Sequence, residues 1–317
     1  MISTKSNLIP GSGRAQKKRI ASEWTSPLLA LALSLSLLAL GGVAQTRRAG
    51  RNESHSQPAL TAAERDLVNQ AIGVVCNERK TDPKGSIPID EMQSRPSLPV
   101  RSPEAQEGAE RAQRLLPVAR SLVIQSLRRL AREYKFQSRY QLRIKQAISR
   151  VEGVTSVKPD MDARDNASVF LSHPRTINFG TIFLAGLPSD EGMISVLAHE
   201  LTHIADGDNE LLTALFRAIG NRASDLTGQE IRDQRAEELS CDLVGALAVR
   251  SFVTSTPSYE PLPRRIARSL EHNCVDEDEG DDDHLSPRNT IRALLSLNQS
   301  LARELISGRY ETSLPRR

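Results

Sequence analysis

Two histidines flank a glutamate in the pattern His-Glu-x-x-His at His199, Glu200 and His203, near the middle of this 317-residue chain. The surrounding stretch, residues 188–207, has apolar side chains at helical spacing, and Ser189 stands where a helix N-cap is expected. On a helix the two histidines lie one turn apart and project together, so both imidazoles can bind one metal ion. Glu200 can reach a metal-bound water without pointing at the metal itself. The motif therefore predicts a helix that carries part of a zinc site.

A catalytic zinc site needs three protein ligands and one open position, so a further ligand is required. The helix-like segment 233–249 carries the acids Glu237, Glu238 and Asp242. Because Glu238 and Asp242 are four residues apart, one can bind the metal while the other orients a ligand histidine. We predict Glu238 as the third ligand and Asp242 as the orienting acid. Glu237 is the alternative ligand, but one turn after it stands Cys241, which orients an imidazole less well.

The plain alternative is a pair of histidines that share a helix and bind nothing. The chain has only six histidines, so a chance match to the pattern is expected in well under ~1% of chains of this composition. An apolar helix around the motif, a carboxylate-bearing helix after it and a strand before it all favour a true zinc site. We therefore expect one Zn²⁺ per chain.

The N-terminus is basic and is followed by an uncharged apolar run over residues 27–44 that ends in a small-x-small pattern. Residues 1–44 are predicted to be a signal peptide, so the chain would be exported to a periplasm or secreted. The basic part is long, and the alternative is an uncleaved anchor that tethers the chain to a membrane. Residues 45–106 are expected to form an N-terminal helical segment and a proline-rich linker, with a capping box between Thr61 and Glu64. Residues 107–317 form the expected main domain.

The main domain is expected to be α+β and mainly helical. An amphipathic helix begins near Glu107, Pro117 marks a helix start or a kink, and a second helix covers residues 137–151. Arginines crowd the polar side of these helices; a solvated face is favoured over contact with anionic lipid or an acidic partner. Short strands are predicted at residues 169–171 and 176–184, giving a small sheet beside the active-site helix.

Charge and cysteine content narrow the range of partners and binding sites that the chain could have. The net charge of +3 is too small to indicate a nucleic-acid partner. Cys76 and Cys274 could pair in an oxidising compartment, whereas Cys241 is expected to be a buried free thiol. The acidic run at residues 276–283 lacks EF-hand spacing and is interpreted as a solvated loop rather than a calcium site.

The segments "HELTHIADGD" and "RAEELSCD" resemble the two zinc motifs of the HtpX-like and CAAX-prenyl-endopeptidase-like metallopeptidases, a gluzincin family. The resemblance covers about residues 107–301 and implies a zincin-like core in which Glu238 is the third ligand and Asp242 the orienting acid. A metzincin would need glycine at Asp206 and histidine at Asn209. The segment between the motifs is short and polar, which is similar to the soluble, exported members.

The resemblance also implies a substrate site and an activity. The strand region of the family forms an active-site edge, which places an extended substrate along Thr181, Ile182, Phe183, Leu184 and Ala185. His284, Arg288 and Arg292 are candidates for stabilising the oxyanion by their place in the last family-like segment.

The expected function is that of a zinc-dependent endopeptidase acting on peptides or unfolded proteins in envelope quality control, with Glu200 activating a zinc-bound water. Two alternatives stay open. One is a catalytically silent, chaperone-like or scaffold protein on the same fold. The other is a zymogen whose cleft is covered by residues 45–103.

Overall fold

The computed structural model describes residues 59–79, 85–164, 166–169, 175–275 and 280–311. All of them belong to one compact unit, residues 56–317. The expected signal peptide, residues 1–44, lies outside the described residues, as do the expected strand positions 170–171 and part of the acidic run. Among the helices that are described, none has the length and apolar character needed to cross a membrane.

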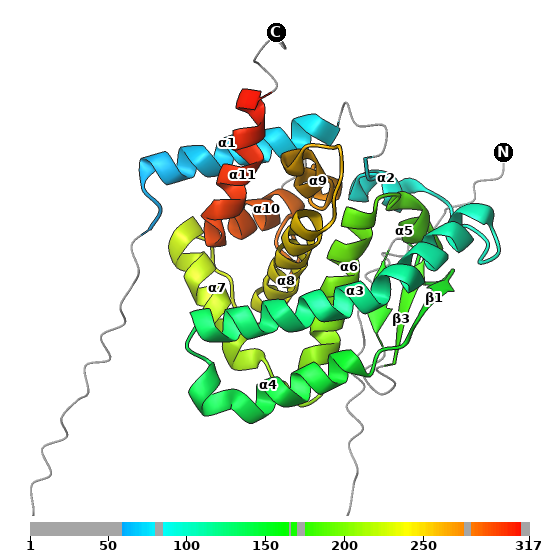
Figure 1. Ribbon diagram of the computed structural model, residues 1–317, viewed down its shortest axis with the longest axis horizontal. Coiled ribbons are helices and arrows are strands. Elements are labelled where there is room, and N and C mark those ends of the chain that lie inside the picture. Colours follow the sequence, from blue (N-terminus) through cyan, green and yellow to red (C-terminus); the bar gives the residue numbers. More distant parts are fainter. Residues whose placement is uncertain (1–58, 80–84, 165, 170–174, 276–279, 312–317) are drawn as a thin grey trace, which may run out of the picture. The chain divides into compact units, whose positions relative to one another are not determined.

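The fold is mainly helical with one small sheet, as the sequence predicts (Figure 1). The helices are α1 (Ala62–Arg79), α2 (Ile89–Ser94), α3 (Pro103–Glu133), α4 (Gln137–Glu152), α5 (Thr181–Gly186), α6 (Asp190–Asp206), α7 (Thr213–Thr227), α8 (Asp233–Ser255), α9 (Leu262–Arg268), α10 (Pro287–Leu297) and α11 (Gln299–Glu311), with a 3₁₀ turn, η1 (Glu271–Asn273). Helices α6 and α8 pack along each other, and α3 crosses both (Figure 1).

Helix α1 confirms the predicted capping box. The Thr61 amide donates to the Glu64 carboxylate over 2.8 Å, and the Glu64 amide donates back to the Thr61 hydroxyl over 3.3 Å. The apolar side of α1 packs against α9, α10 and α11, so the N-terminal segment is part of the same core as the main domain. The Cys76–Cys274 disulfide links the last turns of α1 to the residue after η1. Cys241 is a buried free thiol, as expected.

Helices α3 and α4 form a long antiparallel hairpin (Figure 1). Ser102 caps α3 by accepting a hydrogen bond from the Ala105 amide over 3.3 Å. The helix then continues through Pro117, so of the two interpretations of that proline, a helix start or a kink, the helix start is wrong. Helix α4 covers the second predicted helix with one residue added at its end.

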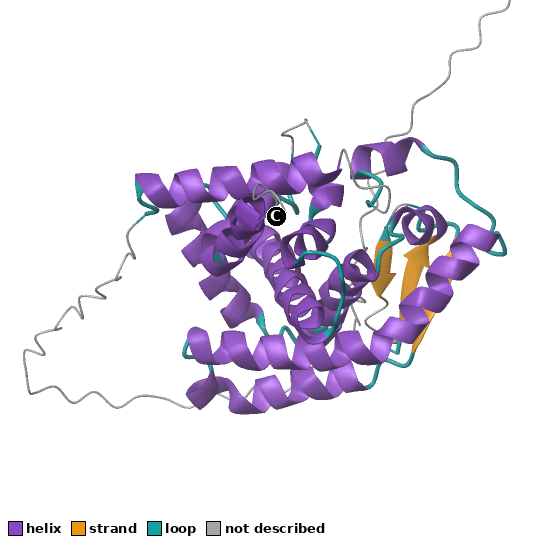
Figure 2. Ribbon diagram, turned by 45° about the horizontal axis from the view of Figure 1, so that its top comes forward, coloured by secondary structure: helices purple, strands orange, loops and turns teal. Residues whose placement is uncertain are grey.

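The sheet has the strand order β1-β3-β2 and flanks the helices (Figure 2). Strand β1 (Ser156–Asp160) runs parallel to β3 (Thr176–Gly180), and β2 (Ala167–Val169) runs antiparallel to β3 on its other side. Strand β1 packs on α3, whereas β2 lies beside α6. The edge of the sheet nearest α6 is therefore β2.

The expected edge strand over Thr181–Ala185 is wrong, because these residues form helix α5. The strand stops at Gly180, where an added Cβ would lie 2.0 Å from the Arg164 carbonyl oxygen. The amides of Ile182 and Phe183 donate to that same oxygen over 3.1 and 3.3 Å instead of to a neighbouring strand. A tertiary contact thus overrides the strand propensity of an apolar, β-branched run.

Candidate metal centre

Helix α6 carries the His-Glu-x-x-His motif, and its start is fixed by its own sequence. The Ser189 hydroxyl accepts a hydrogen bond from the Gly192 amide over 3.0 Å, as predicted for an N-cap. Asp190 and Glu191 occupy the first turn, where negative charge suits the helix dipole. The helix is buried along most of its length, so its ligands are held on a rigid element.

Helix α8 runs antiparallel to α6 and brings the acids of the second segment to the histidines. The motif's first histidine, His199, meets Asp242, and the second, His203, meets Glu238 four residues earlier in α8. Midway along the pair, Gly245 lies against the backbone of Ser195, which allows the two helices to approach closely.

Three ligand atoms converge at this point. The Nε2 atoms of His199 and His203 are 3.1 Å apart, and they lie 3.2 and 3.3 Å from Oε2 of Glu238. Among the described residues, these three form the group of histidine, cysteine and acidic side chains that could hold a metal ion. The structure therefore brings together the ligand set that the sequence predicts.

The spacing of these atoms fits zinc. Ligand atoms about 2.0–2.1 Å from a tetrahedral ion lie about 3.3–3.4 Å from one another. The observed separations of 3.1–3.3 Å are close to this value. Two imidazole nitrogens and one carboxylate oxygen are also a donor set that catalytic zinc sites use.

Each histidine has its second nitrogen held by a carboxylate. Nδ1 of His199 lies 2.7 Å from Asp242, and Nδ1 of His203 lies 3.0 Å from Glu237. Each carboxylate accepts the Nδ1–H, which leaves the Nε2 lone pair facing the shared point. Glu237, the alternative ligand, thus takes the position of an orienting acid for His203. The sequence carries one signal for this: two ligand histidines need two orienting partners, and Asp242 can serve only one of them.

The electrostatics of the cluster favour a cation. Burial lowers the pKa of His199, but Asp242 and Glu238 outweigh it, and the net pKa lies well above the ordinary value. The pKa of His203 is raised in the same sense against burial, with hydrogen bonds to Glu237 and Glu238 among the causes. Burial raises the pKa of the Glu238 carboxyl, yet the two histidines reverse this and hold it far below its usual range. The site thus attracts protons to its histidines, and a divalent ion would satisfy the same negative potential.

The thiol of Cys241 does not compete as a ligand. Burial raises its pKa to about 11, so it stays protonated at neutral pH. Only a thiolate would be a strong zinc ligand. Cys241 therefore packs behind His203 as a small, buried group.

Glu200 lies between the two ligand histidines in sequence and is only 7% exposed. Burial raises the pKa of its carboxyl, against the opposing effect of positive charge on His199 and His203. A carboxylate of raised pKa next to a ligand site can accept a proton and later return it.

Of the three residues predicted as candidates for stabilising the oxyanion, only one lies near the ligand cluster among the described residues. His284 comes to the site, with Nε2 3.7 Å from Oε2 of Glu238 and its side chain 58% exposed. Its Nδ1 lies 3.1 Å from the Asp281 carboxylate. Arg292 instead bonds Asn289, one turn away on its own helix. Within the described part of the chain, neither Arg288 nor Arg292 contacts the metal centre.

Two arginines fix the ends of α6. At its start, buried Arg265 donates to Glu191 over 2.7 Å and to the carbonyls of Val253 and Thr256, in the last turns of α8, over 3.1 and 2.7 Å. At its end, Arg150 of α4 donates to the Ile204 carbonyl over 2.7 Å. Arg265 therefore links the start of α6 to the end of α8 away from the ligands, whereas Arg150 holds α6 at the residue that follows His203.

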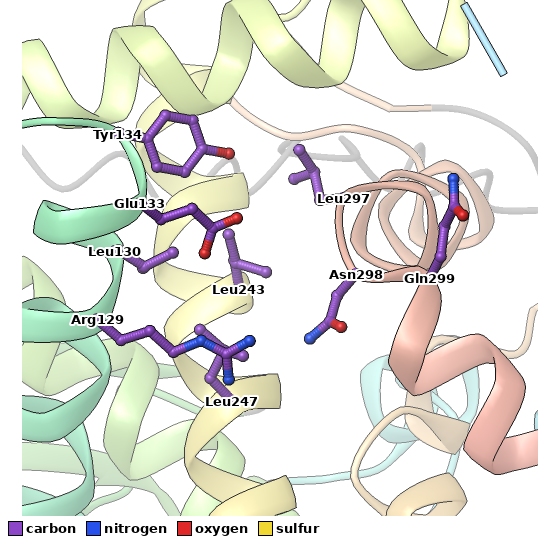
Figure 3. A pocket seen from close by; sticks show the side chains of 9 residues that line it. All are labelled: Arg129, Leu130, Glu133, Tyr134, Leu243, Leu247, Leu297, Asn298 and Gln299. Atoms are coloured by element: carbon purple, nitrogen blue, oxygen red, sulfur yellow. The ribbon is translucent and has the colours of Figure 1, made fainter.

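A cavity of about 100 Å³ lies away from this centre, between the end of α3, the outer side of α8 and the α10–α11 junction (Figure 3). Four leucines and the polar side chains of Arg129, Glu133, Tyr134, Asn298 and Gln299 line it (Figure 3). None of the residues that line it belongs to the metal centre.

Comparison with known proteins gives no relative: no family model, curated protein or solved structure matches the chain.

Proposed function

We propose that the protein is an exported zinc-dependent endopeptidase with a zincin-like core. The observation that carries this proposal is the convergence of His199, His203 and Glu238, whose ligand atoms lie within 4.8 Å of one another. Glu200 lies on α6, the helix that carries the two histidines. The resemblance of the two motifs to HtpX-like and CAAX-prenyl-endopeptidase-like metallopeptidases supports the same conclusion. Unfolded proteins of a cell envelope are the proposed substrates.

The chain's residues divide the chemistry between them. His199, His203 and Glu238 would hold the ion, and zinc, when bound, supplies Lewis-acid chemistry that acidifies water and polarises a carbonyl. Glu200 takes a proton from the attacking water at its carboxylate and passes it to the leaving amine. Asp242 and Glu237 keep the imidazoles in the required tautomer and orientation.

His284 is the residue best placed to stabilise developing negative charge on the substrate oxygen. It stands at the edge of the ligand cluster, it is exposed, and Asp281 orients its other nitrogen. A hydrogen bond from its Nε2–H to the oxyanion would act in the transition state more than in the ground state.

The strand proposed to bind an extended substrate differs from the one that the sequence predicts. Strand β2 pairs with β3 on one edge, no described strand pairs with its other edge, and it contacts α6. An extended peptide that adds to the outer edge of β2, at Ala167–Val169, would pass along the motif helix. This replaces Thr181–Ala185, which lie in α5 and are largely buried.

Metal analysis and a cleavage assay test the function together. The wild type should bind one zinc ion and cleave an unfolded substrate such as casein, and His203→Ala or Glu238→Ala should lose the zinc. Glu200→Gln should keep the zinc and lose about 10²–10⁴-fold in cleavage rate. Glu210→Gln, which changes an exposed acid just after α6, is the matched control and should cleave normally. Cleavage by pure Glu200→Gln protein at the wild-type rate would refute the assigned role.

The chaperone-like alternative makes a different prediction from the same variant. A catalytically silent scaffold would protect cells or prevent aggregation equally well with Glu200→Gln as with the wild type. A protein without zinc and without cleavage, but with full protection, would replace the peptidase proposal.

A further inference from the structure

We propose that the connected ends of α3 and α4 form a docking surface for an anionic membrane. The surface, called here the cationic tip, consists of Arg128, Arg129, Arg132, Lys135, Arg139, Arg143 and Lys145. The tip is located where the α3–α4 hairpin turns, at the lower left of Figure 1. The proposal concerns where the molecule sits and does not depend on the metal centre.

The charge of the tip is almost wholly of one sign. All seven cations are exposed, and Glu133 is the one acid between residues 128 and 145. Among the described residues, no ion pair or hydrogen bond engages the side chains of these seven cations. The hairpin's other arginines behave differently: Arg120 bonds the carbonyls of Glu152 and Val154, and Arg150 bonds that of Ile204. The tip therefore leaves its positive charge free for a partner.

An exposed leucine stands among these cations. Leu142 is 69% exposed, the largest exposed fraction of any large aliphatic side chain among the described residues. It lies one turn after Arg139 and next to Arg143, on the outward side of α4. Cations around a protruding aliphatic side chain are the pattern of a surface that meets anionic headgroups and inserts an apolar group between them. Sequence alone favoured a merely solvated face, because it did not show that Leu142 protrudes.

Aromatic contacts at Tyr140 hold two of the tip's arginines in place. Tyr140 stacks on Phe136 with ring centroids 4.2 Å apart. The guanidinium carbons of Arg139 and Arg143 each lie 5.7 Å from the Tyr140 ring centroid. These cation–π contacts restrict the two arginines on one side of α4 and lower the entropy lost on docking.

A membrane fits the tip better than a nucleic acid does. Single-stranded nucleic acid is bound through aromatic side chains on which bases stack. At the tip Phe136 is buried and Tyr140 is half-buried beneath its arginines, so neither offers a free ring. The uncharged run at residues 27–44 also directs the chain to a membrane, either to cross it or to stay in it.

A dye on the tip tests the proposal in the full chain. Gln146 is exposed on α4, one turn after Leu142, and Gln146→Cys would carry an environment-sensitive dye. The chain's own cysteines do not interfere, because Cys76 and Cys274 are joined and Cys241 is buried. The labelled protein is reconstituted with vesicles of phosphatidylcholine alone or with added phosphatidylglycerol. The dye should report an apolar environment only with the anionic lipid, and high salt should reverse this.

Two charge variants of equal net charge identify the surface. Replacing Arg139, Arg143 and Lys145 with glutamine should lower the docked-to-free ratio about 100-fold, roughly fivefold for each cation lost near an anionic surface. Replacing the exposed cations Lys158, Arg175 and Arg303 with glutamine should leave it unchanged. Both variants should stay folded, because all six side chains are exposed, and the loss of the two cation–π contacts should lower the melting temperature of the first by only a few degrees.

Three results would overturn the proposal. The first is a dye response on neutral vesicles equal to that on anionic vesicles. The second is an equal fall in the docked-to-free ratio in both charge variants. The third is a response to a single-stranded oligonucleotide without one to anionic vesicles, which would assign the tip to nucleic acid instead.

Discussion

Replacing Gly245 with alanine tests whether the spacing of α6 and α8 sets the geometry of the metal centre. An added Cβ at Gly245 would lie 2.9 Å from the carbonyl oxygen of Ser195, where ordinary contacts begin at 3.4 Å. The obstacle is backbone, so it cannot turn aside, and α8 must move away from α6 by about 0.5 Å at this point.

The displacement would reach the ligands. Asp242 stands one turn before Gly245 in α8, and Glu238 stands two turns before it. Metal sites tolerate changes in ligand distance of about 0.2 Å, less than half of the required movement. We therefore expect Gly245→Ala to weaken zinc binding by about 10–100-fold, the range for loss of an orienting partner. Overpacking costs about 1–3 kcal/mol, and the better helix propensity of alanine returns about 1 kcal/mol, so the zinc-free protein should lose at most about 2 kcal/mol of unfolding free energy.

Zinc affinity is measured by competition with a chelator, and stability by urea unfolding of the zinc-free protein. Gly73→Ala is the matched control, because Gly73 is also inside a helix but an added Cβ there meets nothing within 4 Å. The control should gain up to about 1 kcal/mol and bind zinc normally. Wild-type zinc affinity in Gly245→Ala would refute the reasoning, since the two helices would then accommodate the methyl group without moving the ligands.

Three further predictions concern neighbouring groups. Glu237→Ala should weaken zinc binding about 10–100-fold in the same competition assay, because His203 loses its orienting carboxylate. Burial raises the pKa of Asp206 to about 6 from 3.8, so the folded state holds the extra proton, and this group contributes a fall in unfolding free energy of up to about 3 kcal/mol as pH rises from 4 to 6. Asp206→Asn keeps an acceptor for the Leu212 amide and should remove that fall in urea unfolding at the two pH values. Arg265→Met should cost about 3–5 kcal/mol of unfolding free energy by leaving Glu191 buried and unpaired, and adding Glu191→Gln should restore part of it.

The parts of the site that the sequence predicted depend on local spacing. Helical periodicity and the Ser189 cap placed the motif on α6, and the four-residue intervals put each pair of side chains on one face. The ligand set then followed from what zinc requires, and the structure brings those atoms together. The same local logic explains the Thr61–Glu64 capping box, which the structure confirms.

The strand prediction failed where a distant residue decided the outcome. Residues 176–184 have a strand-like pattern, and the single glycine at 180 fits a bulge within a strand as well as the end of one. The end is set by the Arg164 carbonyl, which accepts the amides of Ile182 and Phe183. The sequence therefore identified a sheet beside the motif helix but assigned its edge to the wrong segment, and β2 takes that place.

Spacing in the sequence determines which atoms can meet, but other residues determine how firmly they are held. Glu191 and the end of α8 are joined through Arg265, on an element that shares no motif with either helix. Because α6 and α8 are antiparallel, this connection fixes the start of α6 and the end of α8 at the same end of the helix pair. The ligands lie at the other end of the pair, and the close contact at Gly245 lies between. A zinc site needs its ligands held to within fractions of an ångström. That precision depends on a close backbone contact and a buried ion pair, and both exist only once the chain has folded.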